Sequence, residues 1–88
     1  MEDDNLLIRV GARTSAKRAA AETIAAVDSG RSVTWLFKRD THSKPIFAAL
    51  GDWKAPYGTV SRVGHGQTVA YFSNVASGQM AHTFWHHN

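Results

Sequence analysis

Residues 6–37 read LLIRVGARTSAKRAAAETIAAVDSGRSVTWLF and hold two short apolar runs on either side of an alanine-rich stretch. The first run, 6–10, is rich in branched side chains and stops at Gly11, which predicts a strand. In the second run, 32–37, the large apolar residues Val33, Trp35 and Phe37 occupy every second position and would share one face of a strand, so this run predicts another strand. The stretch between them is long enough for a helix, so this part of the chain predicts a β-α-β unit.

The predicted first helix has a clear start and a clear end. Thr14 or Ser15 can cap it, and Ser29-Gly30 ends it after Asp28. One stripe of the helix is apolar and consists of Ala16, Ala20, Ile24 and Val27. Arg18 and Glu22 are four residues apart and can pair on the solvent side. The small alanines favour close packing of this helix on a sheet.

The rest of the chain continues the alternation and then becomes β-rich. Ser43 is the expected cap of a second helix, with Pro45 in its first turn. Three further strands are predicted, at 59–63, 68–72 and 80–85. The order β-α-β-α-β-β-β predicts an α/β fold, a two-layer sandwich with the helices on one face of a mixed sheet. We expect residues 1–5 to form a flexible acidic N-terminus and 6–88 to form a single domain.

Composition narrows the class of protein. The 88 residues include no cysteine, which excludes disulfides and thiolate metal sites. No apolar run approaches the roughly 20 residues needed to cross a membrane. The acidic start, Glu2-Asp3-Asp4, is atypical of a signal peptide. We therefore expect a cytoplasmic protein with no membrane partner.

Positive charge is concentrated where strands are followed by helices. Every Lys and Arg lies at or before Arg62, although the formal net charge is only +3. The start of a helix offers unpaired N–H groups and a partial positive charge, so added cations favour an anion there. The chain has two such basic junctions between a strand and a helix, at 10–18 and 37–44, and a pair of anion sites suits a polyanion such as the backbone of DNA or RNA. The candidate nucleic-acid-binding residues are Arg13, Lys17, Arg18, Lys38, Arg39, Lys44 and Arg62.

These features resemble the Alba-like group, which includes the archaeal chromatin protein Alba and the sporulation stage V protein S. The resemblance covers residues 7–63 and rests on Val10-Gly11 before a basic loop, the alanine-rich helix, and the basic residues leading into Ser43-Lys44. It implies a small, non-enzymatic protein that is a homodimer and associates with DNA or RNA. In the group, lysines directly after the first strand contact nucleic acid, and Arg13 keeps that charge here.

A protein-interaction module is the alternative function. Residues 63–88 carry no formal charge when their histidines are neutral, and they contain several aromatic side chains. Such a surface suits a protein partner, as in a small bacterial or viral regulator or inhibitor. The candidate interface residues, which would also serve a homodimer, are Trp53, Tyr57, Phe84 and Trp85.

Enzymatic and metal sites are disfavoured. The Ala16-Lys17-Arg18 triplet lacks the glycine and the hydroxyl of a phosphate-binding P-loop. His82 and His86 would lie about 13 Å apart on a strand, too far to share an ion. His42 and Ser43 are consecutive at a helix start and do not converge as a base and a nucleophile must. We expect no catalytic residues, no metal and no cofactor.

Overall fold

Strands and helices alternate in the computed structural model of the chain, which describes residues 5–64 and 66–74. The described elements are β1 (Asn5–Arg9), α1 (Ala16–Asp28), β2 (Ser32–Phe37), α2 (Asp40–Leu50), β3 (Tyr57–Val63) and β4 (Gln67–Ser73). The predicted last strand, 80–85, lies outside the described residues. Neither described helix is long and apolar enough to cross a membrane.

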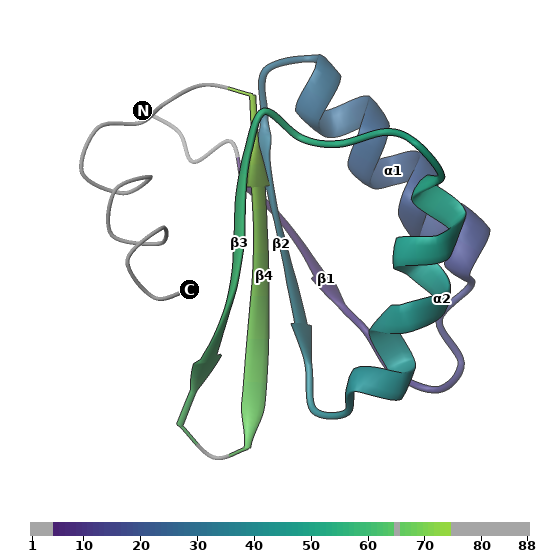
Figure 1. Cartoon of the computed structure of the whole chain (residues 1–88), viewed down its shortest axis with the longest axis vertical. Coiled ribbons are helices and arrows are strands. Elements are labelled where there is room, and N and C mark those ends of the chain that lie inside the picture. Colours follow the sequence, from purple (N-terminus) through teal and green to yellow (C-terminus); the bar gives the residue numbers. More distant parts are fainter. Residues whose placement is uncertain (1–4, 65, 75–88) are drawn as a thin grey trace.

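The strands form one mixed sheet in the order β1-β2-β4-β3. β1 pairs in parallel with β2, while β2 with β4 and β4 with β3 are antiparallel. Both helices lie on the same face of this sheet (Figure 1). The predicted two-layer α/β sandwich with a mixed sheet is therefore confirmed for the described part of the chain.

The core lies between the helices and the central strands. Val33, Trp35 and Phe37 of β2 are buried, and the residues between them are half-buried, as the alternation predicts. On β4, Ala70 and Phe72 face the same layer. α1 contributes Ala19, Ala20, Ala26 and Val27, and α2 contributes Ile46 and Leu50. The small alanines let α1 approach the large side chains of the sheet closely.

Trp35 is the largest fully buried side chain, and its polar atom has a partner. Its indole Nε1 donates a hydrogen bond to Thr23 Oγ1 at 3.0 Å. The Thr23 hydroxyl in turn donates to the carbonyl oxygen of Ala19 at 2.8 Å. A buried N–H without a partner is costly, so this chain of two bonds lets a tryptophan occupy the centre of the core.

The second helix begins earlier than the sequence predicts. α2 starts at Asp40, and Ser43 is a buried residue inside the helix whose hydroxyl donates to Asp40 O at 3.0 Å. Asp40 favours this start because its carboxylate lies near the positive end of the helix dipole. Pro45 consequently lies inside the helix, where it removes one backbone hydrogen bond. At the N-terminus, Asn5 is the first residue of β1, and its side chain accepts hydrogen bonds from Ser32 and Thr34.

Candidate nucleic-acid interface

The sheet topology brings three separate segments of the chain to one end of the molecule. Because β1 and β2 are parallel, their carboxyl ends lie side by side, and Val10 N donates to Leu36 O at 2.9 Å. The antiparallel pairing of Phe37 with Thr68 places the start of β4, and with it the β3–β4 hairpin, at the same end. α2 begins at this end, in the lower part of Figure 1, and α1 begins near mid-height after a loop that passes through the lower right.

Most cations of the chain lie at this end, which we call the basic end. It carries Arg9, Arg13, Lys17, Arg18, Lys38, Arg39 and Arg62, and all seven are exposed. Lys44 is also exposed and lies about one helical turn from the start of α2. Arg31 and Lys54 lie at the opposite end, where β2 and β3 begin, together with the acids Asp28 and Asp52. The structure therefore places six of the seven cations that the sequence analysis selected at this end, and the seventh, Lys44, about one turn further along α2.

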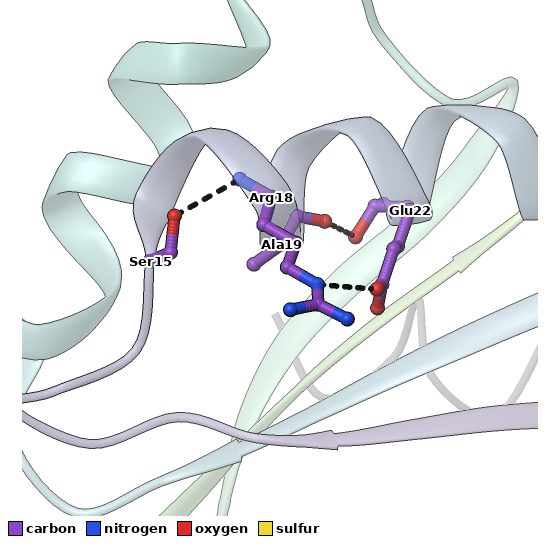
Figure 2. Close-up of polar contacts among 5 residues, drawn as sticks. Ser15, Arg18, Ala19 and Glu22 are labelled. Atoms are coloured by element: carbon purple, nitrogen blue, oxygen red, sulfur yellow. Dashed lines mark hydrogen bonds and ion pairs between the residues drawn. The ribbon is translucent and has the colours of Figure 1, made fainter.

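The loop after β1 is held by its own polar groups. Gly11 N donates to Thr14 Oγ1 at 2.9 Å, and Thr14 N donates to Gly11 O at 3.2 Å. Ser15 then caps α1, its hydroxyl accepting a hydrogen bond from Arg18 N at 3.3 Å (Figure 2). Of the two caps that the sequence allowed, the structure uses Ser15. This ordered turn fixes the backbone from which Arg13 and Lys17 project.

Arg18 differs from the other candidate cations because it has an acidic partner. Its Nε donates to Glu22 Oε2 at 3.3 Å along the surface of α1 (Figure 2). The two side chains are 81% and 47% exposed. Exposed pairs of this kind contribute only about 0.3–0.5 kcal/mol. The predicted pair is confirmed, and its weakness leaves Arg18 able to exchange Glu22 for a phosphate.

The cations at the start of α1 do not serve the stability of the helix. The first turn contains Lys17 and Arg18 and no acidic residue. A cation near the positive end of a helix dipole is unfavourable by about 0.3–1 kcal/mol. A bound anion would offset that repulsion, because it would be attracted by both the dipole and the side chains.

The start of α2 differs from that of α1 in its cap and in the charge of its first turn. Arg39 occupies the cap position, and no side chain makes a capping hydrogen bond there. Asp40, in the first turn of α2, is acidic. His42 follows and is half-buried. The Ser43 hydroxyl donates a hydrogen bond to Asp40 O within the helix.

A recess of about 240 Å³ lies where the strand ends and α2 meet. Its polar lining comes from Arg9, Lys38, His42 and Gln67, and the ends of β1 and β2 complete it. We call it the strand-end recess. Sequence reasoning did not select Arg9 or His42 as binding residues. The signal was present for Arg9, because it is the last residue of the strand that precedes the basic loop.

The two candidate interface residues that the structure describes, Trp53 and Tyr57, are not brought together. Trp53 is half-buried, donates from Nε1 to Asp28 Oδ1 at 3.4 Å, and lines an apolar groove of about 350 Å³ between α2 and the sheet. Tyr57 is half-buried on the other face of the sheet, since its neighbour Gly58 lines the groove. Phe84 and Trp85 lie outside the described residues.

No group of three His, Asp or Glu side chains suited to a metal ion occurs within 5–64 and 66–74. His82, His86 and His87 lie outside those ranges. Comparison of the chain with protein-family models, with curated proteins and with solved structures found no match.

Proposed function

We propose that this chain is a non-enzymatic nucleic-acid-binding protein that contacts phosphates through its basic end. The observation that carries the proposal is the gathering of exposed cations from the β1–α1 loop, the β2–α2 junction and β3 at one end of a single sheet. These segments are distant in sequence, so their meeting is a consequence of the fold.

The distribution of charge supports a polyanionic ligand. Arg31 and Lys54 are the exceptions among the Lys and Arg side chains, and Asp28 and Asp52 accompany them at the opposite end. The molecule thus presents one strongly positive end although its formal net charge is +3. Such an asymmetry attracts an anionic partner and orients it during encounter.

The contacts that this surface offers are to phosphates. Lys and Arg side chains projecting from helix starts and loops fix a protein on a nucleic-acid backbone without reading its sequence. The same positions of basic residues, after the first and second strands, underlie the resemblance to the Alba-like group, and we propose that relationship as well. A cytoplasmic location follows as part of the same proposal.

Binding titrations at different salt concentrations test the proposal. We expect fluorescently labelled duplex DNA, single-stranded DNA or RNA to bind at low salt, with affinity falling by about 0.7–0.9 log unit per log unit of salt for each phosphate contacted. Lys54→Glu, at the opposite end, is the matched control for Arg13→Glu, because both change the charge equally. Absence of binding to all three ligands at low salt would contradict the proposal.

A second candidate function, association with another protein chain, rests on the apolar groove. Phe47, at the edge of the groove, is 40% exposed. Val60 lies on the same face of β3 as Gly58, which lines the groove, and is 42% exposed. Because the helices leave this strip of the sheet uncovered, we propose that a second copy of the chain packs there to give the expected homodimer. Sedimentation equilibrium should show a dimer for the wild type and a monomer for Phe47→Glu. A wild-type monomer at every concentration would contradict the dimer.

A further inference from the structure

The strand-end recess differs in shape and chemistry from the rest of the basic end. Arg9, Lys38 and His42, from the ends of two strands and from α2, line one concave space of about 240 Å³. Among the described residues, those that line the recess include no Asp or Glu. Asp40 is the nearest acid along the chain, and it is exposed on the first turn of α2. The recess thus has two cationic residues, Arg9 and Lys38, among its lining residues, and its volume admits a small anionic group.

From this geometry we infer that the recess binds a phosphate monoester, namely the terminal phosphate of a nucleic-acid strand. The inference rests on the proposed function and identifies the part of the ligand that one site takes. An internal phosphodiester continues into sugars on both sides, so it suits an exposed ridge of cations. A terminal phosphate is attached on one side only and can enter a recess end-on.

Charge favours the same ligand. A phosphate monoester carries about −1.5 to −2 charges at pH 7, against −1 for a diester, and it has three terminal oxygens. Arg9 offers a planar fork of donors, and Lys38 offers three donors on one point charge. His42 can add a donor from its ring, and Gln67 one from its amide. The cations and donors of the recess therefore match the extra charge and the extra oxygen of a strand end.

The adjoining loop gives the rest of the strand a path. Arg9, Val10 and Gly11 are shared between the recess and a second concave surface lined by Ala12, Arg13 and Thr14. A strand whose terminal phosphate lies against Arg9 and Lys38 would continue past Arg13. Arg9 lies at the junction of the two surfaces and is the residue on which the inference depends most.

The test compares oligonucleotides of one sequence that carry a 5′-phosphate, a 3′-phosphate or no terminal phosphate. We expect a phosphorylated end to bind about tenfold tighter than the unphosphorylated strand, the effect of one added charge-assisted hydrogen bond. Arg9→Ala and Lys38→Ala should each remove this preference, while Lys54→Ala keeps it. The Arg9 and Lys38 side chains are exposed, so their replacement should leave the fold intact, and circular dichroism verifies that each variant is folded.

The outcomes separate this inference from the proposed function. Equal affinity for the three oligonucleotides would overturn the recess as a terminal-phosphate site and leave nucleic-acid binding intact. Absence of binding to any of them at low salt would overturn both. A rise in melting temperature with inorganic phosphate, at constant ionic strength and without preference for a phosphorylated end, would assign the recess to free phosphate and overturn the inference.

Discussion

Reversal of the charge at Lys17 should make the protein more stable and its binding weaker. Lys17 is exposed in the first turn of α1, and Ala20 and Ala21 occupy the positions three and four residues on, so no helical ion pair is lost. Replacement by Glu removes an unfavourable cation and adds a favourable anion at the positive end of the dipole. Each part is worth about 0.3–1 kcal/mol, so we expect Lys17→Glu to stabilise the fold by about 1 kcal/mol. For a chain of this size that corresponds to a rise of roughly 4–8 °C in Tm.

The same substitution should remove a phosphate contact. A contact with a salt slope of about 0.9 corresponds to an affinity about eightfold weaker at 0.1 M salt, and the added negative charge increases that loss. Thermal unfolding and fluorescence anisotropy measure the two effects, with Lys54→Glu as the control of equal charge change. A lower Tm for Lys17→Glu would refute the dipole argument. Affinity equal to that of Lys54→Glu would remove Lys17 from the binding surface.

Three further variants test individual contacts. Thr23→Val leaves the buried indole of Trp35 without its acceptor and should cost about 1–3 kcal/mol of unfolding free energy in denaturant titrations; an unchanged midpoint would contradict it. Thr68→Val should act in the opposite direction, stabilising by about 1 kcal/mol, because the buried Thr68 hydroxyl makes no hydrogen bond to any residue that the structure describes; destabilisation would show that this hydroxyl has a partner. Glu22→Ala frees Arg18 and should strengthen nucleic-acid binding severalfold at a stability cost below about 0.5 kcal/mol; weaker binding would count against Arg18 as a phosphate ligand.

The order of the elements could be predicted because local signals agreed with the fold. The alternation in 32–37 matches the observed burial of β2, and α1 ends at Asp28 as its cap residues indicate. The start of α2 could not be predicted from caps alone. Ser43 is a residue type that often caps helices, but it is buried inside α2. The helix starts at Asp40, where an acidic side chain is favourable, four residues before the start at Lys44 that a Ser43 cap would give.

The candidate site was only partly visible in the sequence. The basic residues after each predicted strand were evident, and parallel pairing of β1 and β2 turns this pattern into one surface. The strand-end recess depends on the approach of Gln67 from β4 and His42 from α2, which is a long-range property of the sheet order. Trp53 and Tyr57 looked alike as aromatic surface residues, yet they lie on different faces of the sheet.

The central claim is that the cations of the basic end together form the nucleic-acid surface. Titration of an unlabelled oligonucleotide into ¹⁵N-labelled protein, followed by backbone amide shifts, tests it most directly. We predict that the largest shifts fall in 9–18 and 38–44 and around Arg62, and that the amides near Arg31 and Lys54 change little. Shifts concentrated around Trp53 and Lys54, with the basic end unperturbed, would contradict the account.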